Sequence, residues 1–365
     1  MSNISFLYKN LNNSIKVNLS STWGLNLSKP LQVSIMPNRR CNARCLMCTC
    51  WEEKNDYLDS DDIIKALKQL RKWLGSNFFV QISGGEPLIF KGIYDIFSFC
   101  EDNDIICKIS TNGISLTEKT CDKIIQSKLR FLSVSLDSHI PEIHDKFRGV
   151  ETTFERALKG IDYLAKNGDL TLGISTIIMR DNISTLCDSV DFFLKLPIHR
   201  LLFQPIGIWT ADIPVEKWPE FEYWVNDKDA LNRFEEYLLI KKKEDTRIMN
   251  SERDIKEWSV YFNDPNSQLN YNVKKCNVGY DRISIGYKGD IQIGCGILGN
   301  SGNIKQDNLK DVWNSPSSKK MRQEMMNCTY PCAYNCYKAL TLKEKIKKVQ
   351  VFIKSGLFES KQKKE

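Results

Sequence analysis

Residues 37–48 read PNRRCNARCLMC and place Cys41, Cys45 and Cys48 with three and then two residues between them. Three thiolates at this spacing suit a four-iron cluster and leave one iron without a protein ligand, which makes that iron a reaction site. The run could also bind zinc with a fourth ligand, or hold three unrelated thiols. Because a β-like run at 31–36 precedes it, we expect the thiols at the carboxyl end of a first strand.

Short β-like runs alternate with helix-like segments from residue 31 to about residue 205. This alternation predicts parallel strands joined by helical crossovers. The expected strands are 31–36, 78–83, 105–111, 130–136, 170–178 and 199–205, and the expected helices are 60–74, 92–102, 117–127, 152–167 and 183–195. Six such units form an open doubly wound sheet or an incomplete barrel, and in both the chemistry belongs at the carboxyl ends of the strands.

The pattern changes after residue 205. The next segment carries four tryptophans, which could line a substrate but more often anchor an irregular connector to the core. Beyond Cys276, residues 282–285 and 291–293 flank a Gly-containing turn and predict a β-hairpin. The expected divisions are an N-terminal extension (1–29), the main unit (30–205), a connector (206–272), a small cysteine-rich α+β module (273–337) and a basic helix and tail (338–365).

Composition limits the class of protein. The chain has 365 residues, 42% of them hydrophobic, so it can bury one large core and a smaller module. No run reaches the roughly 18 to 20 apolar residues of a spanning helix. The first thirty residues are polar rather than signal-like, which predicts a cytoplasmic protein. Thirteen cysteines then favour reduced thiolate ligands over a disulfide framework.

The net charge of +7 is concentrated in residues 338–365, which hold nine lysines and three glutamates. The remainder is nearly neutral, so we expect no nucleic-acid partner. Apolar residues at helical spacing make this segment a basic amphipathic helix, which could be a solvated end, pack on the main unit or contact an anionic membrane surface or lipid-linked substrate. The apolar positions are Leu342, Ile346, Val349 and Ile353.

Small and acidic residues follow the second expected strand, as Gly84, Gly85 and Glu86. The glycines let a backbone approach a ligand closely, and the Glu86 carboxylate suits an ammonium group such as that of an amino acid. A glycine pair can also form an ordinary turn.

Polar side chains also end the next two strands, with Asn112 after the third and Ser135 and Asp137 at the end of the fourth. Their amide, hydroxyl and carboxylate groups could hold a ribose or a carboxylate. Each signal is weak alone, because such residues also occur in turns and on polar strand faces.

Taken together on successive strand ends, these motifs make residues 30–205 resemble the radical S-adenosylmethionine enzymes. The CxxxCxxC run combined with GGEP is a specific pair. The resemblance implies an α/β fold, a partial (β/α)6 TIM-like barrel, with a 4Fe–4S cluster whose open iron chelates S-adenosylmethionine. It further implies reductive cleavage to methionine and a 5′-deoxyadenosyl radical, which abstracts hydrogen from a substrate.

The family pattern implies contacts to S-adenosylmethionine. The residues for the methionyl amino group are Gly84, Gly85 and Glu86, those near the ribose or carboxylate are Asn112, Ser135 and Asp137, and a carboxylate partner is Arg148. Met47 replaces an aromatic residue that is common in the family, and adenine could still pack on it. Nearby Cys50 could be a packed thiol or could return a hydrogen atom to a substrate radical.

The C-terminal cysteines resemble the SPASM/Twitch extension, which binds auxiliary iron-sulfur clusters. Five cysteines follow residue 270, enough to ligate one auxiliary 4Fe–4S cluster with one thiol left over. The expected ligands are Cys276, Cys295, Cys332 and Cys336, with Cys328 competing for the fourth position. A zinc site with four thiolates is the alternative.

The resemblance therefore implies an enzyme, a radical S-adenosylmethionine oxidoreductase or mutase-like enzyme acting on a small molecule, a sugar or glycan precursor, or a peptide. A net oxidation with the auxiliary cluster as electron acceptor is the first expectation, and flavodoxin or ferredoxin is the implied type of reductant. A cross-linking or epimerising peptide maturase with a separate recognition protein is the second. An iron-sulfur or zinc protein without chemistry on S-adenosylmethionine is the alternative from another class.

Overall fold

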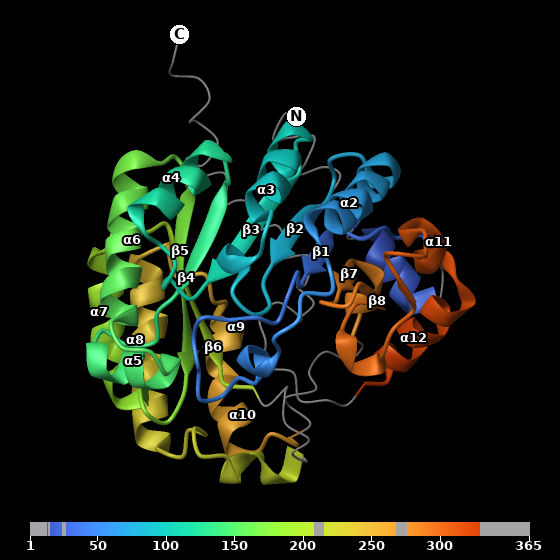
Figure 1. Cartoon of the computed structure of the whole chain (residues 1–365). Helices are drawn as coiled ribbons and strands as arrows, with labels where there is room; N and C mark the ends of the chain where they lie inside the picture. Colours follow the sequence, from blue (N-terminus) through green and yellow to red (C-terminus); the bar gives the residue numbers. More distant parts are fainter. Residues whose placement is uncertain (1–12, 14, 24–26, 208–214, 268–275, 329–365) are drawn as a thin grey trace.

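The computed structural model describes residues 13, 15–23, 27–207, 215–267 and 276–328, and within them nine strands form one sheet (Figure 1). The strand order is β6-β5-β4-β3-β2-β1-β7-β8-β9. Every neighbouring pair from β1 to β6 is parallel, as helical crossovers require. Their bounds are β1 Gln32–Ile35, β2 Phe79–Ile82, β3 Ile106–Thr111, β4 Phe131–Ser135, β5 Thr171–Ile178 and β6 Arg200–Pro205.

Helices follow one another around the outside of these strands and complete an α/β, TIM-like partial barrel, so the predicted fold class is confirmed (Figure 1). They are α2 Ser60–Leu74, α3 Ile93–Asp102, α4 Glu118–Gln126, α5 Pro141–Arg148, α6 Thr153–Asn167 and α7 Leu186–Lys195. Helix α5 was not expected, because its eight residues are mostly polar and show little apolar periodicity.

Helix α2 shows how local sequence builds the outer layer. Asp59 accepts a hydrogen bond from the backbone of Asp62, and the Asp62 side chain accepts one in return, which forms a capping box. The helix ends at Gly75, whose φ of +69° is in the range that glycine adopts most easily. Its apolar face lies against the sheet, and each fully buried leucine there stabilises the fold by about 1.5–3 kcal/mol. The buried residues are Ile63, Ala66, Leu67, Leu70 and Leu74.

The predicted C-terminal hairpin extends the main sheet. Strand β7 (Arg282–Ile285) pairs in parallel with β1, with Val33 opposite Ile283, and then turns through Gly289 into antiparallel β8 (Asp290–Ile293). Strand β9 (Gly302–Asn303) pairs with β8. The hairpin therefore covers the edge of β1 that the six-stranded unit leaves open.

Two helices anchor the hairpin region on α2. Trp313 on α11 (Leu309–Asn314) lies 6.2 Å from the ring of Trp73, and its indole nitrogen donates to the carbonyl of Ser28 at 3.3 Å. Helix α12 (Pro316–Met326) follows directly. The remaining short 3-10 helices are η1 Cys50–Glu52, η2 Pro87–Ile89, η3 Ile183–Thr185, η4 Val215–Glu220, η6 Val278–Tyr280 and η7 Gly296–Leu298.

The tryptophan-rich segment packs beside β6. It forms α8 (Lys228–Glu244), α9 (Glu252–Lys256) and α10 (Trp258–Asn263). Trp218, Trp224 and Trp258 are buried, and the Asn250 side chain bonds both the amide and the carbonyl of Phe203 on β6. These three tryptophans therefore belong to the core and not to an exposed substrate wall.

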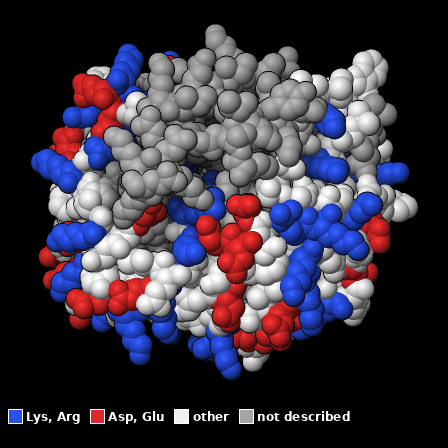
Figure 2. Space-filling view, turned by 90° about the horizontal axis from the view of Figure 1, so that it is seen from above, with Lys and Arg blue, Asp and Glu red and all other residues white. Residues whose placement is uncertain are grey.

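Charged side chains of both signs are interspersed over the described part of the surface seen in Figure 2. By contrast, the arginines that are buried among the described residues are Arg148, Arg282 and Arg322. No helix in the described part of the chain is both long and apolar enough to cross a membrane. The predicted basic segment 338–365 lies outside the described residues.

The β1–β7 pairing predicts a specific stability effect. Ile283 is fully buried between β1 and β8, so Ile283→Ala should lower the free energy of unfolding by about 2–5 kcal/mol, measured by chemical denaturation. The same change at Ile240, which is 56% exposed on α8, should shift it by less than about 0.5 kcal/mol. Equal effects of the two substitutions would show that β7 does not pack within the main sheet.

Candidate active site

The predicted thiols lie on a loop that leaves the carboxyl end of β1, and the Gly84-Gly85 loop holds one side of it. The amides of Gly85 and Glu86 donate to the carbonyls of Asn38 and Arg40 at 3.1 and 2.8 Å. A Cβ at Gly85 would overlap the Arg40 carbonyl, and one at Gly84 would lie 2.6 Å from the carbonyl of Asn38. Both glycines are therefore needed for close contact between two protein loops.

The end of α5 holds the other side of the thiol loop. The amides of Arg44 and Leu46 donate to the carbonyls of Arg148 and Phe147 at 2.9 and 3.1 Å. The next residue, Gly149, has φ +64°, and a Cβ there would overlap the backbone of Arg44. The unexpected helix α5 thus positions the cysteines through its last turn.

Glu86 points into the protein and is fully buried. Its carboxylate accepts hydrogen bonds from the Leu88 amide (3.1 Å), the Thr111 hydroxyl (2.8 Å) and the Asn112 amide (2.8 Å). Burial raises the pKa of Glu86, and these hydrogen bonds oppose that rise. The side chain therefore fixes the glycine loop to the end of β3, and its contact with a ligand amino group stays a prediction.

Two of the cysteine sulfurs are approached by buried donors, one from the end of β3 and one from the end of α5. The side-chain Nδ2 of Asn112 donates to Cys41 Sγ at 3.5 Å, and Arg148 Nη1 donates to Cys45 Sγ at 3.8 Å. Burial raises the pKa of Cys41 to about 11, and the charges of Glu86 and Cys45 add to the rise. Such donors stabilise metal-bound thiolates. These donors suit thiolates that bind iron, and ligation of a cluster by Cys41, Cys45 and Cys48 stays a prediction.

Asp137 forms an ion pair with the Arg148 side chain and orients it. Its carboxylate lies 2.6 Å from Arg148 Nη2 and accepts a hydrogen bond from the Ile177 amide at 3.1 Å. The Asp137 amide donates to Nδ1 of His144, whose pKa burial lowers to about 4. Asp137 is fully buried and positions Arg148, whereas half-buried Ser135 ends β4 at the mouth of the barrel.

Cys50 lies beside the thiol loop on η1. Its amide donates to Cys48 Sγ at 3.4 Å. The pKa of Cys50 falls to about 7, mainly through a hydrogen bond with Cys48 and, against the effect of burial, through the charge of Arg39. The guanidinium of Arg39 also lies 5.5 Å from the ring centre of Tyr287 in the hairpin turn. Sequence reasoning did not find this contact, because nothing local marks a pair so far apart in the chain.

A second group of thiols lies at the opposite end of the strands from the first group. Cys276 precedes β7 and Cys295 follows β8, so both lie near the amino end of β7. The hairpin turn is at the other end of this four-residue strand, about 13 Å away. Burial raises the pKa of Cys276 to about 11, and the charges of Cys328 and Cys295 add to the rise. Ligation by Cys276, Cys295 and Cys328 stays a prediction, and Cys332 and Cys336 lie outside the described residues.

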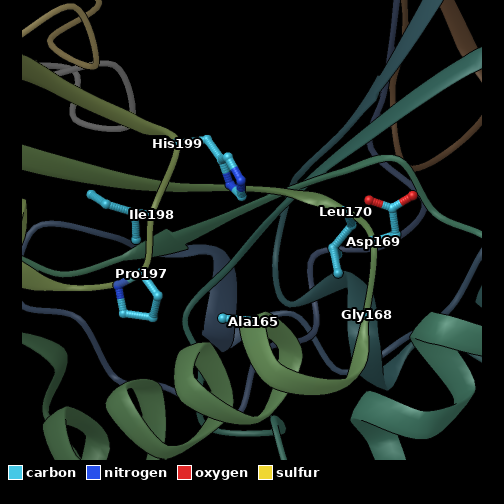
Figure 3. Close-up of a pocket in the computed structure, with 7 residues that line it drawn as sticks. All are labelled: Ala165, Gly168, Asp169, Leu170, Pro197, Ile198 and His199. Atoms are coloured by element: carbon cyan, nitrogen blue, oxygen red, sulfur yellow. The ribbon is translucent and has the colours of Figure 1, made fainter. Parts of the chain in front are cut away.

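A cavity of about 310 Å³ lies elsewhere, at the amino ends of β5 and β6 (Figure 3). His199 points into this region, and its Nδ1 accepts a hydrogen bond from the Leu172 amide at 3.1 Å. The lining residues are Ala165, Gly168, Asp169, Leu170, Pro197, Ile198 and His199. It contains none of the predicted site residues and faces away from the strand ends that carry the first thiol loop.

Two family models match the parts of the sequence that carry the two thiol groups. The sequence model of the Radical SAM superfamily matches residues 35–193, and that of an iron-sulfur cluster-binding domain, SPASM, matches residues 276–337. The chain belongs to the radical S-adenosylmethionine superfamily. This radical S-adenosylmethionine protein is an enzyme of the oxidoreductase type, and its cofactors are 4Fe–4S clusters and S-adenosylmethionine. The alternative of a protein without such chemistry is not retained.

Several known proteins are similar to this radical S-adenosylmethionine enzyme. The AdoMet-dependent heme synthase of Nitratidesulfovibrio vulgaris is 26% identical, over 81% of this chain and 83% of that protein. The mycofactocin maturase MftC of Mycolicibacterium smegmatis is 27% identical over 40% of this chain and 38% of that protein. Streptococcus suis SuiB, solved with its precursor peptide SuiA, shares the fold with a TM-score of 0.64 and 22% identity, over 86% of this chain and 71% of that chain.

The tight contact at Gly85 predicts a loss of iron. Gly85→Ala should displace the thiol loop, because the new methyl group would overlap the Arg40 carbonyl, and should remove about half of the bound iron. Gly286→Ala is the matched control, since its Cβ would make an ordinary 3.7 Å contact with Asp290. Iron and sulfide per chain measure the effect, and a Gly85→Ala protein with wild-type iron content would contradict it.

Proposed function

We propose that this enzyme cleaves S-adenosylmethionine reductively, abstracts hydrogen from a small-molecule substrate and passes the remaining electron to an auxiliary cluster, giving a net oxidation. The proposal rests on the separation of the two thiol groups, which lie at opposite ends of the adjacent strands β1 and β7. One group faces the strand-end loops, whereas the other adjoins the paired hairpin. A reductant of the flavodoxin or ferredoxin type would supply the first electron.

The first thiol group would hold the cluster that binds S-adenosylmethionine. When bound, these cofactors supply the electron transfer and carbon–sulfur cleavage that generate the 5′-deoxyadenosyl radical. Cys41, Cys45 and Cys48 would be the ligands, with Asn112 and Arg148 donating to two sulfurs.

Two buried groups at this end of the barrel support the binding of a polar ligand. Nε of Arg148 has no hydrogen-bond partner among the described residues, nor has either amide atom of Asn38. A guanidinium with a spare donor fits the carboxylate of S-adenosylmethionine, and Asp137 holds that guanidinium in place. Gly84, Gly85, Glu86 and Ser135 remain the proposed neighbours of its amino group and ribose.

The second thiol group would hold one auxiliary 4Fe–4S cluster. The electrostatic interaction of Cys276 with both Cys295 and Cys328 supports these three as ligands. Cys332 or Cys336 would supply the fourth thiolate. Full ligation by the protein favours electron acceptance over direct binding of substrate, because no iron is then left open.

The extent of similarity favours a small-molecule substrate. The relative named as a heme synthase aligns with four fifths of this chain, whereas the maturase MftC aligns with two fifths. A peptide substrate presented with a separate recognition protein is the second candidate, supported by the maturase similarity.

The proposed cleavage predicts a direct product. Reconstituted protein incubated anaerobically with dithionite and S-adenosylmethionine should release 5′-deoxyadenosine, detected by liquid chromatography. Replacing Cys41, Cys45 and Cys48 with alanine should reduce release to the buffer background, because the open iron is lost. Cys187 is a half-buried residue on α7, and Cys187→Ser should leave the rate of 5′-deoxyadenosine release unchanged. Absence of product from the intact holoenzyme, with haem-precursor and peptide candidates present, would sink the proposal.

Two clusters predict a defined iron content. The intact protein should hold about eight iron and eight sulfide per chain, and the triple alanine variant about half of each. Cys328→Ser should also lose about half, because it removes a ligand of the other cluster, while Cys187→Ser keeps the full content. About four irons in the intact protein would exclude the auxiliary cluster.

A further inference from the structure

Arg322 on α12 holds a buried positive charge that forms no ion pair with a carboxylate among the described residues. The side chain is 2% exposed. Its Nε donates to the Gly279 carbonyl at 2.8 Å, and its Nη2 donates to the Trp313 carbonyl at 2.9 Å. The guanidinium lies 4.2 Å from the ring centre of Trp313 and 5.6 Å from that of Tyr280. Its Nη1 is buried and has no acceptor in the described part of the chain.

Such a charge is expensive to bury. Two carbonyls and two rings compensate only part of the lost hydration, and a cation without a counter-ion is normally excluded from a protein interior. Burial lowers the pKa of Arg322 to about 10, so the group still carries its charge at neutral pH. The two carbonyls and the Trp313 ring hold the side chain in place, but they supply no negative charge.

The position of Arg322 relates its charge, which no described carboxylate neutralises, to the proposed auxiliary ligands. Gly279, which it bonds, follows Cys276 by three residues, a span of at most about 11 Å. The Val278 amide between them bonds the Cys276 thiol. Helix α12 also leads directly into Cys328. The guanidinium thus bonds the segment that follows Cys276 and is carried by the helix that precedes Cys328, which are two of the segments with proposed auxiliary ligands.

We propose that Arg322 is the fixed counter-charge of the auxiliary cluster and raises its reduction potential, which prepares that cluster to accept an electron. This inference rests on the proposed function. A cluster with four thiolates is anionic, and reduction adds one more negative charge. A nearby buried cation stabilises the reduced form more than the oxidised form, because the reduced form carries one more negative charge. Arg322 is therefore a positioning and tuning group rather than a ligand.

The experiment is a redox titration of the auxiliary cluster followed by electron paramagnetic resonance. The full chain with Cys41, Cys45 and Cys48 replaced by alanine isolates that signal. Arg322→Gln keeps hydrogen-bond donors but removes the charge, and should decrease the equilibrium constant for reduction at least tenfold, which is about 59 mV for one electron. Arg322→Lys keeps the charge and should shift the potential less. Lys319→Gln removes an exposed charge from the same helix and should shift nothing, because water and salt screen it.

Each outcome decides the matter. An unchanged potential in an iron-loaded Arg322→Gln protein overturns the inference, and so does equal loss of cluster and helical structure in the Gln and Lys variants, which would indicate packing alone. Loss of iron from Arg322→Gln but not from Arg322→Lys supports it. Failure of the proposed function is distinguishable, because it appears before Arg322 is changed, either as no 5′-deoxyadenosine from the intact chain or as no iron in the background protein. In the otherwise intact chain, Arg322→Gln should still release 5′-deoxyadenosine.

Discussion

The parallel pairing of β1 with β7 is the interaction on which the rest of this structure depends. β1 ends in the first thiol loop, and β7 begins six residues after Cys276. This pair of strands therefore places the two thiol groups at opposite ends of the strands of one sheet. The hairpin turn after β7 lies near the first thiol loop, where the Arg39 guanidinium contacts the Tyr287 ring. Because strand ladders are rigid over a few residues, the separation of the two groups is set by strand length and not by a flexible linker.

The glycines near the first thiol group act mainly through the protein itself. Gly85 and Gly149 allow two neighbouring loops to approach the backbone of residues 38–46 from both sides, and a side chain at either position would separate them. The cysteine loop is consequently held by backbone hydrogen bonds before any cofactor binds. This preorganisation lowers the entropic cost of arranging three thiolates around one cluster.

Features that depend on neighbouring residues could be predicted from the sequence, whereas features that depend on distant residues could not. All six parallel strands follow from apolar runs, and the start of α2 follows from polar caps near Asp59. By contrast, the addition of β7 to β1 joins residues about 250 positions apart, and Glu86 turns inward only because Thr111 and Asn112 supply its hydrogen bonds.

The two thiol groups differ in the charge that surrounds them. Arg148 contacts Cys45 but is paired with Asp137, so much of its field is cancelled before it reaches the sulfur. Arg322 has no such partner among the described residues, so its field acts more fully on the segments that bear Cys276 and Cys328. A cluster held by those segments would therefore be easier to reduce with the Arg322 charge in place than without it, because reduction adds negative charge.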